Sequence, residues 1–126
     1  MCKLVTIQNN LGDSFDVADI KKDTIEQIIK IAGECNLIDT IYLFGSSVEK
    51  RCTDRSDIDL AIIGKVTRSR LFRSKAYNDF TSKLYKIDED QDYDILTFNS
   101  QAALDNSKEF VARDILTKGN VIFKNA

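Results

Sequence analysis

The sequence predicts an α/β (α+β) fold, a single small domain in which helices flank one mixed β-sheet. Helical and strand-like patterns alternate along the 126 residues, without a repeat, a low-complexity tract or a proline. Hydrophobic residues make up 43% of the chain, which is enough for a real core, and the length suits one domain. We therefore expect residues 1–126 to form one domain, with an additional N-terminal strand segment within residues 1–20.

The first third of the chain predicts an edge strand, a helix and a buried strand. Residues 3–8 alternate weakly between polar and apolar, as an edge strand does. Asp23 and Glu26 resemble a helix capping box, and an apolar stripe follows at helical spacing, so we expect a helix over residues 24–35. The stripe consists of Ile25, Ile28, Ile29 and Ala32. The apolar run at residues 41–44 predicts the buried strand.

The rest of the chain continues the alternation of helix and strand. A long helix is predicted by the apolar stripe of Tyr77, Phe80, Leu84 and Ile87. Gly119 is a natural end for the last helix. In chain order we expect a Gly-Ser turn at 45–46, a short helix around 48–52, a strand carrying Asp57 and Asp59, a helix over 68–87, a strand over 93–98, a helix around 110–116 and a short strand over 121–123.

Two acids, Asp57 and Asp59, accompany an otherwise apolar strand. Residues i and i+2 of a strand point the same way, about 6.6 Å apart. Burying a carboxylate is costly unless a cation neutralises it. Carboxylate oxygens suit Mg²⁺ or Mn²⁺, so the pair predicts a site for one or two such cations. The alternative is a strand end with two solvated acids.

A third acid, Asp94, begins the apolar strand predicted at residues 93–98. Three carboxylates around two cations suit in-line displacement at phosphorus, and the third acid can take the proton of the attacking hydroxyl. Asp92 is the alternative, because it lies on the same strand face at the end of an acidic loop. We favour Asp94 because the apolar run follows it directly.

The turn at Gly45 and Ser46 is a candidate phosphate seat. A glycine at the end of a strand lets the backbone approach a phosphate, and free N–H groups of a following helix would face the anion. Ser46 with Glu49 also fits a capping box, so we expect Ser46 to cap that helix as well. Together with the acids, the turn predicts a nucleoside triphosphate as substrate.

Composition excludes several other functions. The chain has no histidine, which removes Ser-His-Asp and Cys-His catalysis. The three cysteines, Cys2, Cys35 and Cys52, match no zinc or disulfide framework, which favours a cytoplasmic protein. A net charge of −2 argues against general nucleic-acid binding. No run approaches the roughly 20 apolar residues of a membrane helix, and no signal peptide is evident. The basic cluster within residues 65–75 is interpreted as a solvated helix face rather than a docking or triphosphate patch.

The string Gly-Ser, ten residues, Asp-x-Asp and a later Asp resembles the nucleotidyltransferase superfamily of DNA polymerase β, and within it the minimal nucleotidyltransferase (MNT) domains. The resemblance implies the polymerase β-like nucleotidyltransferase fold, from the helix before residue 41 to the end of the chain. It implies that Gly45 and Ser46 hold the triphosphate of ATP. Asp57 and Asp59 would bind the metals, and Asp94 would be the third ligand and the base.

One position departs from that family's pattern. Family members commonly read Gly-Ser-Arg-x-x-Gly, whereas Ser47 follows Gly-Ser here. Ser47, which stands in the place of that arginine, and Lys50 are counted with the candidate nucleotide-binding residues. Lys50, Arg51 or Arg55 would have to supply the missing positive charge.

The resemblance also implies a partner, because MNT proteins often act as antitoxins of helical HEPN-type toxins and some transfer AMP from ATP to toxin tyrosines. Only 32 residues follow Asp94, too few for a domain that would hold an acceptor. We therefore expect a magnesium-dependent nucleotidyltransferase that modifies a hydroxyl of a partner protein. The first alternative is a binding module that neutralises its partner by contact alone. The second is an oligomeric enzyme for small molecules.

Overall fold

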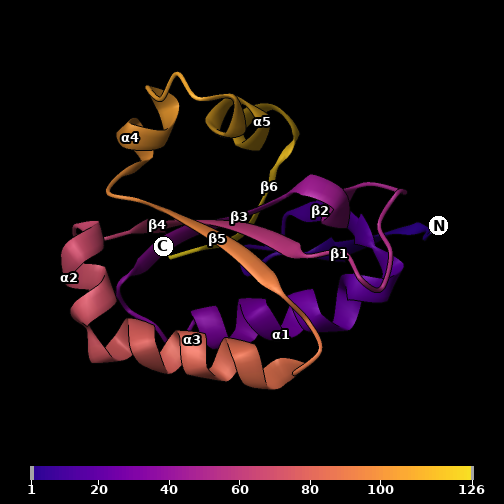
Figure 1. The fold of residues 1–126 in the computed structure, drawn as a ribbon, viewed down its shortest axis with the longest axis horizontal. Helices are drawn as coiled ribbons and strands as arrows, with labels where there is room; N and C mark the ends of the chain where they lie inside the picture. The colour runs from indigo at the N-terminus through magenta and orange to yellow at the C-terminus, as the bar shows by residue number, and fades with distance from the viewer. Residues whose placement is uncertain (1, 126) are drawn as a thin grey trace.

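The computed structural model describes residues 2–125 (Figure 1). Its elements form two separate sheets and a set of short helices. They are, in chain order, β1 (Leu4–Gln8), β2 (Ser14–Ala18), the 3-10 turn η1 (Asp19–Lys21), α1 (Lys22–Ala32), β3 (Ile38–Phe44), the 3-10 turn η2 (Gly45–Val48), β4 (Ile58–Gly64), α2 (Arg68–Arg73), α3 (Lys75–Ile87), β5 (Tyr93–Phe98), α4 (Gln101–Asp105), α5 (Phe110–Lys118) and β6 (Asn120–Lys124).

The main sheet has four strands in the order β5-β4-β3-β6. β4 and β5 run parallel, and the other two pairs are antiparallel. The predicted mixed sheet is thus confirmed. Helices α1 and α3 cover one face of the sheet, and α4 and α5 lie over the other (Figure 1). The fold is the predicted helix-flanked α/β arrangement.

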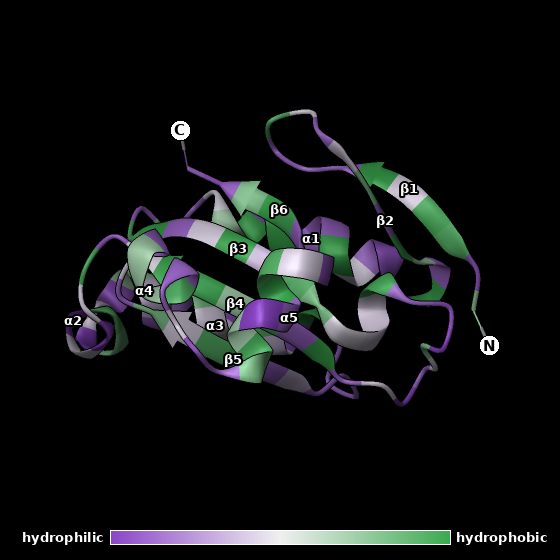
Figure 2. Ribbon diagram, turned by 90° about the horizontal axis from the view of Figure 1, so that it is seen from above, coloured by the Kyte–Doolittle hydropathy of each residue, from purple (hydrophilic) through white to green (hydrophobic). Residues whose placement is uncertain are grey.

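The two faces of β4 belong to two different hydrophobic clusters. Ile58, Leu60 and Ile62 pack into the larger cluster, which includes side chains of α1 and α3. Ala61 and Ile63 pack into a smaller cluster with side chains of α4 and α5. Figure 2 looks onto this second face, where α5 lies across the strands. Odd-numbered residues of β4 therefore face α5.

The N-terminal strand does not join the main sheet as predicted. β1 pairs with β2 in an antiparallel hairpin that forms a sheet of its own, with Val5 opposite Val17. The hairpin loop reaches β6, where the Asn9 side chain donates to the Val121 carbonyl at 3.1 Å. Asn10 bonds the backbone of Lys124 in both directions. Side chains, rather than a further ladder, thus satisfy part of the free edge of β6.

Two helix predictions need correction at their boundaries. The first helix spans Lys22–Ala32 rather than residues 24–35, because the 3-10 turn η1 leads into it; Asp23 lies in its first turn and makes no capping bond. The helix predicted over residues 68–87 is broken at Ser74. The Ser74 backbone is extended, its hydroxyl donates to the Leu71 carbonyl, and its oxygen accepts from the Tyr77 N–H. One serine thus ends α2 and caps α3.

The short helix predicted around residues 48–52 was wrong. The helical turn comes earlier, as the four-residue η2, and Ser46 makes no capping bond within it. The strand at residues 93–98 and the end of α5 at Gly119 are confirmed. The strand predicted over 41–44 is longer and starts at Ile38. The five-residue α4 was not predicted at all.

Cys2, Cys35 and Cys52 are all free thiols. Between residues 2 and 125, no helix has the length and apolar character needed to cross a membrane.

Candidate functional site

Asp59 and Asp94 lie side by side on neighbouring strands. The parallel register of β4 and β5 pairs their Cα atoms directly. Strands of a sheet lie about 4.8 Å apart, and paired residues point to the same face. That face carries Ala61 and lies under α5. The structure thus brings together two of the three predicted acids.

Asp57 lies one residue before β4 and is exposed. Its spacing of two residues from Asp59 suits the same face of the chain. Asp94 is also exposed, whereas Asp59 is half-buried. Asp92 precedes β5, and its carbonyl accepts the N–H of Ile58. The register therefore favours Asp94 over Asp92 as the neighbour of Asp59.

The negative charge of Asp59 is destabilised by its surroundings. Burial raises its pKa to about 6, and the negative charges of Asp94 and Asp57 add to the rise. Arg51 opposes the shift only in part. A carboxylate with this surrounding gains most from a nearby cation, because both desolvation and like-charge repulsion penalise its charge.

Gly45 is required at the end of β3 for two reasons. Its φ is +73°, in the left-handed region that side chains disfavour. A Cβ built there would also collide with Oδ2 of Asp59 and lie 3.1 Å from its Cγ. The glycine thus makes room first for the Asp59 carboxylate. From the sequence alone, that room was expected to hold a phosphate.

The other predicted turn residues differ in their access to this face. Ser46 is mostly buried. Ser47 is fully buried, and its hydroxyl has no hydrogen-bond partner among the described residues. As the turn stands, the Ser47 side chain contributes nothing to the surface. Lys50 is exposed, and its carbonyl accepts the Cys2 N–H at 3.2 Å.

Arg51 is the cation whose charge reaches the acids. It forms an ion pair with Glu49, and its charge also acts on Asp59 and on Asp114 of α5. Neither Lys50 nor Arg55 contributes in this way to the pKa of Asp59. Among the three cations considered from the sequence, Arg51 is thus the one whose charge opposes the rise in the pKa of Asp59.

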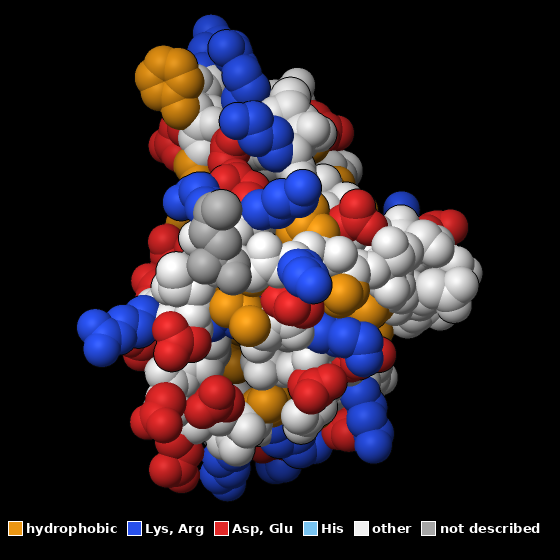
Figure 3. All heavy atoms as spheres, turned by 90° about the vertical axis from the view of Figure 1, so that its right-hand side faces the viewer, with side chains coloured by type: hydrophobic (Ala, Val, Ile, Leu, Met, Phe, Trp, Pro, Cys, Tyr) orange, Lys and Arg blue, Asp and Glu red, His pale blue; other side chains and the backbone are white. Residues whose placement is uncertain are grey.

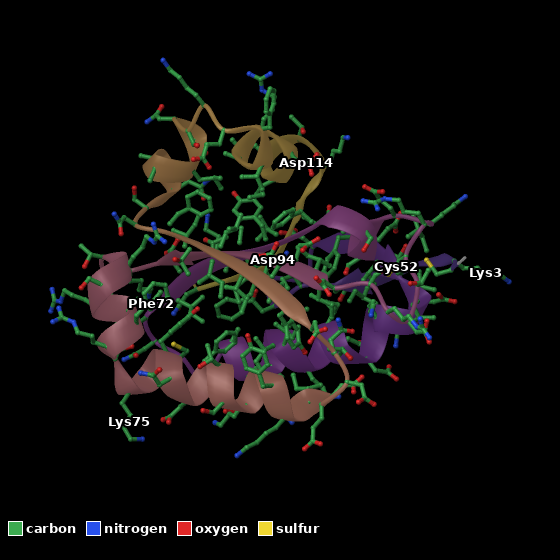
Figure 4. All side chains as sticks on the ribbon, in the orientation of Figure 1. Lys3, Cys52, Phe72, Lys75, Asp94 and Asp114 are labelled. Carbon is green, nitrogen blue, oxygen red and sulfur yellow. The ribbon has the colours of Figure 1, made fainter. Side chains whose placement is uncertain are left out.

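Helix α5 forms a wall above this end of the sheet. Figure 4 shows Asp94 on β5 below the helix that carries Asp114. A hollow of about 530 Å³ lies against α5 and is lined by Phe110, Val111, Arg113, Asp114, Thr117 and Lys118. All six lining residues belong to α5, so this open hollow runs along one side of that helix.

The three acids of the site suit a hard divalent cation that brings further ligands with it. Within residues 2–125 no three acidic or cysteine side chains converge closely enough to hold a metal ion by themselves. The register pair Asp59 and Asp94, with Asp57 nearby, offers carboxylate oxygens only. Mg²⁺ usually takes one or two protein carboxylates and completes its shell with water and substrate phosphate. The acids thus suit a cation that arrives with a triphosphate.

Two buried polar residues near the acids were missed by the sequence analysis. Lys21 is 3% exposed and Gln91 is 8% exposed, and they bond each other at 2.6 Å. A signal for Lys21 was present, since it continues the buried stripe of α1 at a spacing of four residues before Ile25. Gln91 is the uncharged residue in an acidic loop that was interpreted as solvated.

Comparisons with known proteins agree with the fold. The sequence model of the family described as polymerase beta, nucleotidyltransferase, matches residues 26–126. A search of curated proteins found no significant match. Among solved structures, a variant of the toxin-antitoxin MntA-HpeT shares 22% identity, with 80% of this chain and 73% of that chain covered and a TM-score of 0.55.

Two further solved structures are similar. A tri-AMPylated Shewanella oneidensis HEPN toxin in complex with MNT antitoxin shares 22% identity, with 83% of this chain and 73% of that chain covered and a TM-score of 0.50. A toxin-antitoxin with AMP-PNP shares 21% identity, with 82% and 73% covered and a TM-score of 0.53. Likeness at this level of identity supports the fold and not the details of the site.

Proposed function

The chain belongs to the polymerase beta nucleotidyltransferase family, and from that premise we propose that it transfers AMP from ATP to a hydroxyl of a partner protein. The observation that carries the proposal is the direct pairing of Asp59 with Asp94 in parallel strands. It gathers like charges beside a strand-end turn, with Arg51 as the cation that opposes them. Such a cluster of like charges destabilises the fold when no cation is bound. It suits divalent cations that also bind the phosphates of a substrate.

In this proposal Asp57, Asp59 and Asp94 hold Mg²⁺ or Mn²⁺. When bound, such cations neutralise the triphosphate and stabilise the attacking and leaving oxygens of an in-line displacement. The acceptor oxygen forms a bond to the α-phosphorus of ATP while the bond from that phosphorus to the pyrophosphate oxygen breaks. Pyrophosphate leaves, and the hydroxyl proton passes to a carboxylate of the chain.

Asp94 is the residue we assign to that proton. Its side chain is exposed, so an incoming hydroxyl can reach it, whereas Asp59 is half-buried against Gly45. A general base must lie within hydrogen-bond reach of the proton that it accepts. The turn at Gly45 and Ser46 and the charge of Arg51 would contact the phosphates, with Ser47 and Lys50 as further candidates.

The proposed partner is a HEPN-type toxin, with this chain as its antitoxin. One solved structure of similar fold is a tri-AMPylated HEPN toxin in complex with an MNT antitoxin. Another contains AMP-PNP. The proposal transfers these roles to the present chain because the family match and the fold agree.

Labelled ATP tests the proposed reaction. The chain would be incubated with a co-expressed HEPN-type toxin, Mg²⁺ and ATP labelled at either the α- or the γ-phosphorus. We expect the toxin to gain label from α-labelled ATP and none from γ-labelled ATP, because AMP retains the α-phosphorus. Asp57→Asn and Asp59→Asn should abolish the labelling. Labelling from γ-labelled ATP alone would indicate a kinase instead.

A second candidate function is neutralisation of the partner by contact alone. The observation that favours it is the burial of Ser47, which leaves the turn without the charged side chain that the family commonly has there. Under this alternative the partner is inhibited equally by wild type and by Asp59→Asn, without added mass. Intact mass of the inhibited partner separates the two functions.

A further inference from the structure

Lys21 is a buried cation with three hydrogen-bond partners. Its Nζ donates to the Ser56 carbonyl at 2.9 Å, to the Asp54 carbonyl at 3.3 Å and to Oε1 of Gln91 at 2.6 Å. An ammonium has three protons, so each one has an acceptor. None of the acceptors is a carboxylate, so the buried positive charge of Lys21 has no counter-charge among its partners. Burying such a charge costs free energy, and stability alone does not explain a lysine at this position.

The partners of Lys21 lie directly before the acids of the site. Asp54 and Ser56 belong to the loop that ends at Asp57. Gln91 lies three residues before Asp94, at the entry to β5. Because β4 and β5 are parallel, both segments lie at the same end of the sheet. The ammonium therefore ties together the two backbone segments that carry the carboxylates.

Gln91 completes the tie. While its Oε1 accepts from Lys21, its Nε2 donates to the Ser56 carbonyl at 3.0 Å and to the Asp92 carbonyl at 2.7 Å. The Asp92 carbonyl also accepts the N–H of Ile58, so a backbone hydrogen bond joins the residue before β5 to the first residue of β4. Every polar atom of the Gln91 side chain is thus used to join the loop before β4 to the loop before β5.

Lys21, which holds the two loops together, lies outside the part of the chain that matches the family. The family match begins at residue 26, so it excludes the hairpin, η1 and Lys21. The same N-terminal segment also holds the loop at a second point, because the Cys2 N–H donates to the Lys50 carbonyl. Residues 2–21 therefore grip the segment between η2 and Asp57 near both of its ends.

We propose that Lys21 is a positioning residue that sets the spacing between Asp57 and the Asp59–Asp94 pair, and so tunes divalent-metal binding. This inference rests on the proposed function of the acids as metal ligands. Lys21, in the N-terminal segment, would act through its hydrogen bonds to Gln91 and to the Ser56 carbonyl. Partners that orient metal ligands commonly change metal affinity by roughly 10–100-fold when they are removed.

The test uses the full chain and Mn²⁺ as the probe. Lys21→Met keeps the apolar stem and removes the ammonium. We expect its Mn²⁺ dissociation constant, measured by electron paramagnetic resonance, to rise at least roughly tenfold. Lys21→Arg, which keeps a charge and several donors, should restore most of the affinity. Lys22→Met is the matched control and should bind like wild type, because the neighbouring Lys22 pairs with the helix-surface acids Asp23 and Glu26.

A second readout separates positioning from stability. In Lys21→Met we expect faster hydrogen exchange at the amides of Ser56 and Ile58, with unchanged exchange in α3. A merely structural role would instead speed exchange in α3 too and leave Mn²⁺ affinity of the folded protein unchanged. If Lys21→Met fails to fold, Gln91→Met carries the same test, because it leaves the two carbonyl partners of Lys21 in place.

The possible failures are distinguishable. Wild-type Mn²⁺ affinity and wild-type exchange at Ser56 and Ile58 in Lys21→Met would overturn the inference and leave the proposed function intact. If wild type binds no Mn²⁺, with or without ATP, the proposed function fails, and the inference, which rests on it, falls with it. Faster exchange at Ser56 and Ile58 would then support only the mechanical link between the two loops.

Discussion

Asp59 concentrates the electrostatics of the site, and its environment explains the residues around it. It is paired with Asp94, lies two residues after Asp57 and sits against Gly45. This half-buried carboxylate excludes a side chain at Gly45, has a raised pKa, and feels the charge of Arg51. A side chain with these costs is retained for chemistry rather than for folding.

The pKa of Asp59 gives a stability prediction with a definite sign. Its folded-state pKa of about 6 exceeds the ordinary value of 3.8. Below about pH 4 both folded and unfolded chains hold the proton and no penalty arises. Between about pH 4 and pH 6 the unfolded chain has released this proton while the folded protein still holds it, so stability falls across this window. Above about pH 6 Asp59 is ionised in the folded protein too, and the full loss amounts to about 1–2 kcal/mol after allowance for solvent screening.

Asp59→Asn should therefore raise the melting temperature of the metal-free protein at pH 8 and change it little near pH 4. The matched control is Asp57→Asn, which removes the same charge from an exposed side chain and should gain less. Thermal melts at the two pH values measure both variants. An Asp59→Asn protein that is less stable than wild type at pH 8 would point to a structural role for the carboxylate.

The two serines of η2 should respond in opposite ways to the same substitution. The Ser47 hydroxyl is buried without a partner, so Ser47→Ala should stabilise the protein by about 1 kcal/mol. Ser46→Ala should leave stability nearly unchanged and weaken ATP binding. Denaturant unfolding and calorimetry measure the two effects. Weaker ATP binding by Ser47→Ala would mean that the turn opens to expose Ser47 when nucleotide binds.

Arg51 should matter more than its two basic neighbours. Its charge acts on Asp59, which Lys50 and Arg55 do not influence in this way. We expect Arg51→Ala to lower the rate of AMP transfer by roughly one to two orders of magnitude, the effect of losing one charge-assisted hydrogen bond. Lys50→Ala and Arg55→Ala are the matched controls. Equal losses in all three variants would argue for diffuse attraction of ATP instead.

At the scale of elements, the strands of the main sheet were predictable, apart from the early start of β3, whereas most helix boundaries were not. The apolar run of β5 has sharp polar limits, so its bounds follow from sequence. The break between α2 and α3 does not, because Ser74 lies within a continuous helical pattern and acts through two hydrogen bonds that periodicity does not report. The separate hairpin was missed because alternation indicates a strand without indicating its neighbour.

Ser74 provides the test at this scale. Ser74→Ala removes the bond to the Leu71 carbonyl and the cap of the Tyr77 N–H, so it should cost about 1 kcal/mol of stability. Ser82→Ala, at an exposed position inside α3, is the matched control and should be neutral or slightly stabilising. Urea unfolding compares the two. Equal effects would mean that the break at Ser74 is set by packing rather than by its hydroxyl.

The candidate site shows the same division between pattern and context. The spacing of Asp57, Asp59 and Asp94 was legible because acids in apolar strands are unusual. Gln91 was not, since a glutamine in an acidic loop looks solvated, and the helical spacing of Lys21 before Ile25 was outweighed by its charged neighbours. The hydrogen bonds that satisfy both buried residues come from the loops before β4 and β5, which no local pattern brings together.

At the scale of the whole molecule, the structure combines a family fold with an N-terminal addition. The matched residues supply the sheet, the acids and the wall of α5. The hairpin covers the edge of β6 and leads to Lys21. On the face that carries the hairpin, basic and acidic side chains intermingle (Figure 3). A net charge of −2 likewise argues against general nucleic-acid binding.

The most direct test of the central claim is the affinity of the chain for ATP, measured by calorimetry with and without Mg²⁺. The carboxylates of Asp57, Asp59 and Asp94 should repel the triphosphate unless a cation lies between them. We therefore predict weak binding without metal and clearly tighter binding with it, and loss of that difference in Asp59→Asn. Equal affinities of the wild-type chain in both conditions would contradict the metal-dependent site.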